Sequence, residues 1–393
     1  TRAEHVDAAQ AVRQAGLALE GRAETLLVAP GDIPLIRPET LRKMIAQHRT
    51  EGAVATTLTL GEPTAEEAFS GVVCFREEWL WPSLARLARR SNGEGTLADL
   101  VALARDQGES VASLPADDPL EVASVDDRLG LARAEAEMRR RINERWMLAG
   151  VTLVHPEVTY IEAGVEIGAD TVVWPNTLLQ GGTRIGQRCT IGPGSIIRDS
   201  TIGDGCRVEL SVVEQAIMEE GSDVGPFGHL RKGAHLGQGA HMGNFGEVKN
   251  SYLGPGVKMG HMSYLGDATV GAGANIGAGT ITCNYDGQRK HRTLIGEDAF
   301  IGSDTMLVAP VEIGDGAKTG AGSVVTRDVP PGRVAYGVPA RIKATPACPL
   351  PAPVPSSAEG EEKPQHSSPP LAGSVPSNAE GETAGERDES EVE

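Results

Sequence analysis

The chain has 393 residues, with 49 glycines, only 4% aromatic residues and a formal net charge of −18. This length predicts two domains or more, and the negative charge argues against a nucleic-acid partner, because a phosphate backbone requires a basic surface. No apolar run is long enough to cross a membrane, so we expect no membrane span.

The cysteines indicate a reducing compartment. Their number is odd and no C-x-x-C pair occurs, so neither a disulfide framework nor a cysteine-based zinc site is favoured. We therefore expect reduced thiols in a cytoplasmic protein at all five positions, which are Cys74, Cys189, Cys206, Cys283 and Cys348.

Residues 1–123 alternate between strand and helix patterns, which predicts an α/β domain. The first helix should place Leu41, Met44 and Ile45 on one apolar face. The pattern contains no glycine-rich loop that could cradle a phosphate. The expected elements are strands at 26–28, 53–60 and 72–75, and helices from about Pro38, at 84–90 and at 97–105.

Residues 124–150 predict a long helix that links two domains. Ser124 can serve as its N-cap, and Asp126 and Asp127 follow where acidic side chains suit the helix dipole. The helix should continue to Leu148.

From residue 151 to 344 aliphatic residues recur every six positions, often with glycine directly after. This period fits neither an isolated helix nor a hairpin, but it is typical of a parallel β-helix, in which each triangular coil has three short strands. Such a prism has no pocket of its own, so its chemistry must lie on its outer faces or between neighbouring prisms. The repeat is carried by Ile161, Ile167, Val173, Leu179, Ile185 and Ile191, by Leu230, Leu236, Met242, Leu253, Met259, Leu265, Val270 and Ile276, and by Ile295, Ile301, Leu307 and Ile313.

Two segments depart from the repeat. A polar excursion separates Ile276 from Ile295, and loops that leave the face of a solenoid are places where binding groups gather. Residues 345–393 are rich in Pro, Ser, Ala and Glu, and we expect a disordered acidic tail there.

Three histidines have a spacing that raises the possibility of a metal site. His229, His235 and His241 lie six residues apart, so they occupy equivalent places on three successive faces of one coil and cannot converge within one chain. Between the subunits of a trimer they could still meet at a zinc ion, as in hexapeptide-repeat carbonic anhydrases. Ordinary outward-facing polar positions of a solenoid are the competing interpretation.

His261 has surroundings that suit catalysis. Histidine can take a proton from an amine that attacks a carbonyl, and Glu247 could orient its ring. Arg231, Lys249 and Lys290 supply cationic donors for a phosphate. The competing interpretation is a solvated basic face with a lone surface histidine.

The motifs GNFGEVKN, KMGHMSYLG and GAGTITCNYDG resemble the acetyltransferase domain of the bifunctional UDP-N-acetylglucosamine pyrophosphorylase/glucosamine-1-phosphate N-acetyltransferase family. The resemblance covers about residues 149–328. It implies a left-handed parallel β-helix that assembles as a homotrimer. It also implies acetyl transfer from acetyl-CoA to glucosamine 1-phosphate, within UDP-N-acetylglucosamine biosynthesis for cell-wall precursors.

The resemblance assigns roles to individual residues. It implies that His261 is the general base and that Glu247 orients it. The positions that match glucosamine 1-phosphate contacts are Arg231, Lys249, Tyr264, Asn275 and Lys290. The positions that match acetyl-CoA contacts are Ala278, Asn284, Tyr285, Ser303 and Ala321. The family also has an arginine near 337–338 that grips the CoA phosphate; this chain lacks it there, and Arg341 could substitute.

Residues 1–123 resemble the pyrophosphorylase half of the same family in pieces. In GDIPLI, Asp32 matches an Mg²⁺ ligand, and Asp126 falls where the family has an asparagine ligand. A turn aspartate without a metal is the alternative for Asp32. The glycine-rich opening segment with its lysine is absent, and Leu60 passes almost directly to Ala68, where the family has a long insert. We therefore expect that this chain does not transfer a uridylyl group from UTP.

The leading hypothesis is thus a glucosamine-1-phosphate acetyltransferase. A nucleotidyltransferase that makes UDP-N-acetylglucosamine is one alternative. A non-catalytic solenoid or a metal-dependent carbonic anhydrase is the other.

Overall fold

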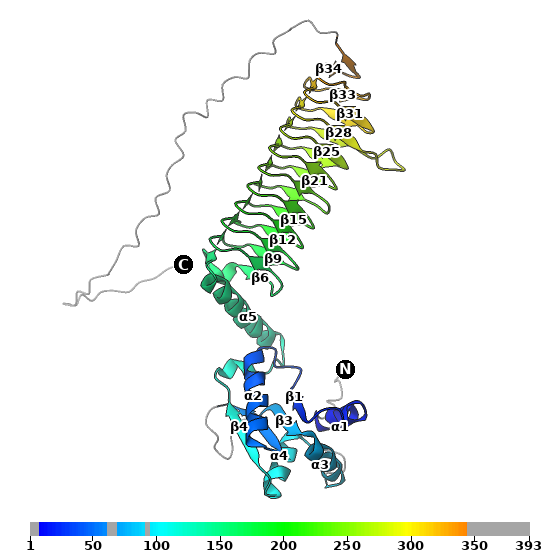
Figure 1. Ribbon diagram of the computed structural model, residues 1–393. Coiled ribbons are helices and arrows are strands. Elements are labelled where there is room, and N and C mark those ends of the chain that lie inside the picture. The colour runs from blue at the N-terminus through cyan, green and yellow to red at the C-terminus, as the bar shows by residue number, and fades with distance from the viewer. Residues whose placement is uncertain (1–7, 61–68, 91–94, 344–393) are drawn as a thin grey trace, which may run out of the picture. The chain divides into compact units, whose positions relative to one another are not determined.

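The computed structural model describes residues 8–60, 69–90 and 95–343 (Figure 1). The N-terminal part contains a four-stranded sheet in the order β1-β3-β2-β4, in which β3 is antiparallel to both neighbours and β4 is parallel to β2. The predicted α/β domain is confirmed. Its elements are α1 (Ala8–Leu19), β1 (Thr25–Val28), α2 (Pro38–Glu51), β2 (Ala55–Thr59), β3 (Phe69–Arg76), α3 (Glu77–Arg90), α4 (Leu97–Asp106), β4 (Val111–Pro115) and the 3₁₀ helix η1 (Pro119–Val122).

Two apolar clusters cover this sheet. The predicted apolar face of α2 packs through Leu41, Met44 and Ile45 against the cluster that includes Leu58 of β2. The other cluster joins Phe75 of β3 to residues of α3 and α4. Burial of large apolar side chains in these two clusters stabilises the sheet.

The linking helix α5 runs from Arg128 to Leu148, and its N-cap corrects the prediction. The Asp127 carboxylate accepts the Gly130 N–H at 2.6 Å and caps the helix, whereas the Ser124 hydroxyl donates to Asp126 instead. Near the other end, the buried Asn143 amide donates to the carbonyl oxygens of Pro156 and Thr159, which fastens the helix to the first coil. None of the helices in the described ranges is both long and apolar enough to traverse a membrane.

From Thr152 onward the chain winds into a parallel β-helix with three sheets. Up to β33 (Val324–Val325), neighbouring strands of a sheet are three strands apart in the chain, whereas the last two strands form an antiparallel hairpin. One 3₁₀ helix, η2 (Pro156–Val158), precedes the first full coil. We call the three sheets the first, second and third sheet, in the order in which each coil visits them.

The first sheet contains β5 (Thr152–Leu153), β8 (Val172–Val173), β11 (Thr190–Ile191), β14 (Arg207–Val208), β17 (Asp223–Val224), β20 (His241–Asn244), β23 (Lys258–His261), β26 (Asn275–Ile276), β29 (Phe300–Ile301), β32 (Lys318–Thr319), β34 (Val334–Gly337) and β35 (Ala340–Ile342). The second contains β6 (Tyr160–Ile161), β9 (Leu178–Gln180), β12 (Ile196–Arg198), β15 (Val212–Glu214), β18 (His229–Leu230), β21 (Glu247–Lys249), β24 (Tyr264–Gly266), β27 (Ile281–Cys283), β30 (Met306–Val308) and β33 (Val324–Val325). The third contains β7 (Glu166–Ile167), β10 (Arg184–Ile185), β13 (Thr201–Ile202), β16 (Ile217–Met218), β19 (His235–Leu236), β22 (Tyr252–Leu253), β25 (Ala268–Val270), β28 (Thr293–Ile295) and β31 (Val311–Ile313).

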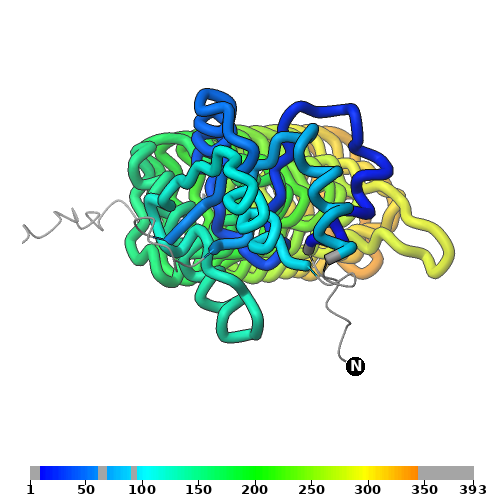
Figure 2. The backbone as a smooth tube through the Cα atoms, turned by 90° about the horizontal axis from the view of Figure 1, so that it is seen from below, coloured from blue at the N-terminus to red at the C-terminus, as the bar shows by residue number. Residues whose placement is uncertain are grey.

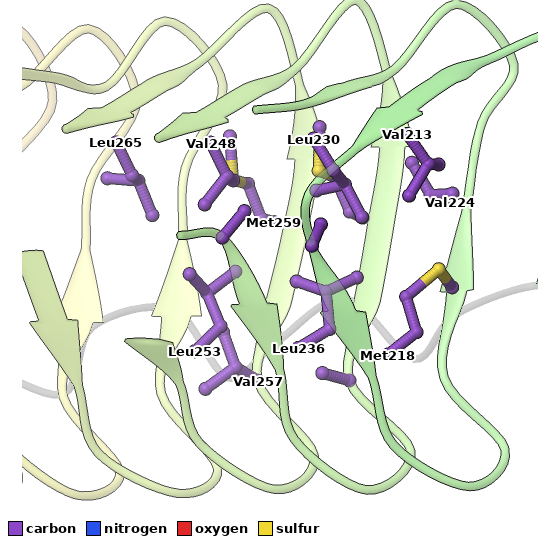
Figure 3. Close-up of a cluster of buried hydrophobic side chains, with 14 of the residues drawn as sticks. Val213, Met218, Val224, Leu230, Leu236, Val248, Leu253, Val257, Met259 and Leu265 are labelled. Carbon is purple, nitrogen blue, oxygen red and sulfur yellow. The ribbon is translucent and has the colours of Figure 1, made fainter. Parts of the chain in front are cut away.

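The six-residue repeat predicted the core of the β-helix. The aliphatic residues of the repeat are buried, and Figure 3 shows Leu230, Leu236, Leu253 and Leu265 around the axis. Thr319 interrupts the aliphatic series, but its hydroxyl accepts the Gly302 N–H at 2.9 Å, so the buried polar atom is satisfied.

The predictions for the cysteines and for the tail can also be compared with the structure. Cys74, Cys189, Cys206 and Cys283 are free thiols, and Cys348 lies outside the described residues. The acidic tail predicted at 345–393 also lies outside them.

Candidate active site

His261 lies at the corner where the first sheet turns into the second. It ends β23 and is the in-register partner of Asn244 in β20. The coils that follow continue the same line: the His261 carbonyl oxygen accepts the N–H that follows Ala278, and the Ala278 carbonyl oxygen accepts the N–H that follows Ser303. Ala321 extends the line, since the N–H that follows it donates to the carbonyl oxygen of Ser303.

We call these five residues the corner column: Asn244, His261, Ala278, Ser303 and Ala321. His261, Ser303 and Ala321 are exposed, and the other two are half-buried. Three of the residues predicted to contact acetyl-CoA therefore lie in one line with the predicted base. The resemblance assigned each of these residues separately. The register of the coils shows that they lie on consecutive coils.

Each residue of the corner column follows a glycine. A Cβ on Gly302 would lie 2.6 Å from the carbonyl oxygen of Thr319, and a Cβ on Gly243 would overlap the carbonyl oxygen of Gly260. Stacking of the coils therefore requires glycine at these two positions. The five glycines are Gly243, Gly260, Gly277, Gly302 and Gly320.

Three cationic residues gather near the second sheet: Lys249 ends β21, Arg231 directly follows β18, and Lys290 lies in the polar excursion after β27. The nearby Lys290 side chain, followed by the charge of Arg231, lowers the pKa of Lys249 from its ordinary value. The Tyr264 ring lies over Gly266, where an added Cβ would overlap its hydroxyl oxygen. Four of the five residues predicted to hold the sugar phosphate, namely Arg231, Lys249, Tyr264 and Lys290, thus lie in one region. The fifth, Asn275, starts β26 on the first sheet.

Glu247 has a different partner from the one predicted. Its Oε1 accepts a hydrogen bond from Arg231 Nη1 at 2.7 Å, and this ion pair raises the pKa of Arg231. At His261 Nδ1 the hydrogen-bond partner is instead Asn244 Oδ1, which accepts. Glu247 therefore hydrogen-bonds Arg231 and not the His261 ring in this structure. Any catalytic role of Glu247 stays a prediction.

The polar excursion is an ordered hairpin that projects from the stacked coils (Figures 1 and 2). Tyr285 and Lys290 form an antiparallel bridge across it. The Asp286 carboxylate accepts the backbone N–H of Arg289 and contacts the His291 ring, which lowers the pKa of Asp286. The contacts of Asp286 therefore hold the tip of the hairpin in a folded turn. This turn places Lys290 close to Lys249.

Asn284, at the root of this hairpin, is buried, whereas Tyr285 is exposed. The Asn284 amide donates to Asp267 at 2.6 Å, and Asn250 donates to the other oxygen of the same carboxylate. The sequence reasoning missed both Asp267 and Asn244. Asn244 could have been found from its position one coil before His261.

The histidines of the proposed metal site do not converge within the chain. His229, His235 and His241 lie on the second, third and first sheets, as their spacing predicted. Each pairs with a carboxylate of the preceding coil: Glu214 at 3.4 Å, Glu219 at 2.7 Å and Asp223 at 2.9 Å, respectively. Among the described residues, no group of three or more His, Cys, Asp or Glu side chains could hold a metal.

The two aspartates predicted to bind Mg²⁺ lie on adjacent segments of the N-terminal part. The Val125 N–H donates to the Asp32 carbonyl oxygen at 2.8 Å, and Asp126 follows directly. Both aspartates are exposed. Mg²⁺ is usually held by one or two carboxylates together with substrate phosphates, so this donor pair fits the ion only when a nucleotide supplies the remaining ligands.

Comparison with known proteins gives two family matches. Residues 7–104 match the MobA-like NTP transferase domain, and residues 164–199 and 292–327 match the bacterial transferase hexapeptide repeat. The hexapeptide match, together with the three parallel sheets, confirms the prediction of a left-handed parallel β-helix.

The chain is also similar to curated proteins over most of its length. It is 38% identical to the "Bifunctional protein GlmU" of Shouchella clausii (strain KSM-K16), over 83% of this chain and 79% of the relative. It is 41% identical to the protein of the same name from Pelobacter propionicus, over 85% of this chain and 79% of the relative. The Geobacter sulfurreducens protein of that name is 40% identical, over 83% and 79%.

Proposed function

Because this chain belongs to the GlmU family of bifunctional proteins, we propose that its β-helix transfers an acetyl group from acetyl-CoA to glucosamine 1-phosphate. The observation that carries the proposal is the corner column. An exposed imidazole whose Nδ1 is already engaged stands in line with the residues predicted to contact acetyl-CoA, and the same β-helix carries the cation cluster of Arg231, Lys249 and Lys290.

The proposed reaction is direct transfer. His261 Nε2 takes a proton from the sugar ammonium group, the amine nitrogen attacks the thioester carbonyl, a C–N bond forms and the C–S bond breaks. The leaving CoA thiolate takes a proton, so CoA thiol and N-acetylglucosamine 1-phosphate are released. No acyl-enzyme is required. Burial raises the pKa of Cys283, the nearest thiol on β27, which makes it a poor nucleophile.

Arg231, Lys249 and Lys290 are proposed to hold the sugar phosphate. Three like charges within one cluster repel each other, and the lowered pKa of Lys249 reports that repulsion. A phosphate near neutral pH carries between one and two negative charges and accepts several hydrogen bonds, so it would relieve the repulsion. Glu247 neutralises part of the charge at Arg231.

A homotrimer would complete this site. Phe227 and Phe245 stack at a centroid distance of 5.2 Å, and each ring is 53% exposed; Met262 continues this apolar edge beside His261. Exposed aromatic ladders of this kind suit burial against a second copy. In addition, Asn275 on the first sheet and Lys249 on the second sheet lie on different faces of one chain. A neighbouring subunit would bring one face of each kind together.

We propose that Arg341 binds the CoA phosphates in place of the family's arginine near 337–338. The corner column continues in register from Ala321 to Gly337, because Thr319 pairs with Ala335. Gly337 belongs to the terminal hairpin of β34 and β35, in which the exposed Arg341 is the partner of Tyr336. An arginine at this end of the line can donate bidentate hydrogen bonds to phosphate.

A thiol-release assay tests the proposed function. The purified chain with acetyl-CoA should release CoA thiol only when glucosamine 1-phosphate is added. Glucosamine without the phosphate should react far more slowly, because it lacks the group that the cations bind. Equal rates with the two sugars would contradict the phosphate assignment, and no release with either would refute the acetyltransferase.

The lowered pKa of Lys249 predicts a pH dependence of sugar-phosphate binding. Lys249 loses its charge at a lower pH than an ordinary lysine, so KM for glucosamine 1-phosphate should begin to rise earlier as the pH increases. Lys290→Ala removes the main cause of the shift. The variant should bind about 10- to 100-fold more weakly near neutral pH, but its rise in KM should start at higher pH.

The control for this measurement is Lys43→Ala, which removes an exposed lysine that pairs with Asp117 in the N-terminal part. Its KM profile should match that of the unaltered protein. If Lys290→Ala left the onset of the rise in place, the two lysines would not be coupled in solution.

Uridylyl transfer from UTP is the second candidate activity, since residues 7–104 match an NTP transferase domain. We propose that the 393-residue chain lacks this activity, because the stretch after Leu60 is too short to carry the family's sugar- and uracil-binding insert. Residues 61–68 lie outside the described part. Pyrophosphate release from UTP, N-acetylglucosamine 1-phosphate and Mg²⁺ would show the opposite.

A further inference from the structure

We propose that Asn244 is the positioning residue of the site: its side-chain oxygen holds the proton of His261 on Nδ1 and thereby keeps Nε2 free to act as the base. This inference rests on the proposed acetyl transfer. It differs from the role that the resemblance gave to Glu247.

The contact is part of the stacking of the coils. Asn244 and His261 are register partners in β20 and β23, and Asn244 Oδ1 hydrogen-bonds His261 Nδ1. The Asn244 carbonyl oxygen accepts the Met262 N–H at 3.0 Å, so the backbone directly after His261 is bonded to the same residue. Asn244 therefore makes one hydrogen bond to the ring itself and one to the backbone of the residue that follows His261.

The chemistry of the pair determines the tautomer. A neutral imidazole has one N–H and one lone pair, and a side-chain amide oxygen can only accept. The nitrogen that faces Asn244 Oδ1 must therefore carry the proton, which leaves the lone pair on Nε2. No carboxylate hydrogen-bonds or ion-pairs with His261 in the described part of the chain, and Glu247 is engaged by Arg231.

A neutral partner has a further advantage over a carboxylate. A carboxylate at Nδ1 would stabilise the protonated imidazole, which cannot accept a proton from an amine. An amide oxygen selects the tautomer without that effect. Asn244 is half-buried, and the next residue, Phe245, stacks on Phe227, so the corner that carries the amide is braced.

The first test compares two substitutions. Asn244→Ala should lower kcat about 10- to 100-fold and leave KM for both substrates within about twofold, because it disturbs the base and not the binding groups. Asn244→Asp keeps an acceptor oxygen and should recover most of kcat. Its pH–rate profile should have the acidic limb moved to higher pH by about one unit, since the new carboxylate stabilises the imidazolium.

The matched control is Gln238→Ala, which removes another amide side chain, exposed at the turn before His241. It should retain the kcat and the pH profile of the unaltered protein. An Asn244→Ala variant with normal kcat, or an Asn244→Asp variant as inactive as Asn244→Ala, would overturn the proposal.

The second test observes the tautomer directly and needs no activity. Nitrogen-15 NMR of the imidazole groups at alkaline pH, with the His261 signals assigned from His261→Gln, should show the proton on Nδ1. In Asn244→Ala the two tautomers should mix. An unchanged tautomer in that variant would overturn the role of Asn244. Failure of the unaltered protein to acetylate glucosamine 1-phosphate would refute the proposed function and leave the tautomer result standing.

Discussion

Replacing His261 by alanine should lower kcat for acetyl transfer by about 10²- to 10⁴-fold, the usual contribution of a general base. KM for acetyl-CoA and glucosamine 1-phosphate should change little, because the cations and the remainder of the corner column stay in place. The thiol-release assay measures both constants. The fold should persist, since the side chain is exposed and its hydrogen bond joins it only to Asn244.

His155→Ala is the control for this variant. His155 is also an exposed histidine with an oxygen partner, the Glu157 carboxylate at 2.9 Å, but it lies at the first coil. It should leave kcat unchanged. If His261→Ala kept kcat within about threefold of normal, another group would have to accept the proton from the amine.

Gly243→Ala should destabilise the β-helix and disrupt the site together. An added methyl group would overlap the carbonyl oxygen of Gly260, and a backbone atom of the adjacent coil cannot rotate away. Overpacking of this kind costs about 1–3 kcal/mol or more. The unfolding midpoint in urea should fall, and kcat should fall as well, because the coils must separate where Asn244 meets His261.

Gly260→Ala is the matched control one coil further along. A Cβ at Gly260 meets no atom within 4 Å, and neither glycine requires a positive φ. This variant should unfold at the same urea concentration as the unaltered protein. Equal midpoints for the two variants would show that the coils can absorb a methyl group at Gly243.

The core of the β-helix could be predicted from the sequence because each coil repeats one local rule. Ile191 and Leu230 were predicted from their place in the six-residue period, and both are fully buried. The period marks an inward position in each short strand, and stacking of the coils buries all of these side chains.

The contacts of the site could not be predicted in the same way. Coils differ in length by a residue or more, so a spacing in the sequence does not state which side chains meet. Asn244 lies opposite His261 and Glu247 lies opposite Tyr264. The resemblance pointed to Glu247, whereas the register brings the amide to the imidazole.

The N-cap of α5 illustrates how a distant contact decides between two local signals. Ser124 and Asp127 are both good capping residues. The N–H of Val125, next to Ser124, donates to the Asp32 carbonyl oxygen, which holds this stretch outside the helix. Asp127 is then the first residue free to cap.

The corner column has a consequence for the size of the molecule that the surface can accept. Its members come from consecutive coils, and neighbouring strands of a sheet are about 4.8 Å apart, so three steps take the line from His261 to Ala321 in roughly 14 Å. Backbone hydrogen bonds set every step, so substitution of an outward-facing side chain leaves the pitch unchanged. The number of coils between His261 and Ala321 therefore sets the length of this surface. Adding or deleting one whole coil would change that length by one step, to match a carrier with a longer or shorter chain.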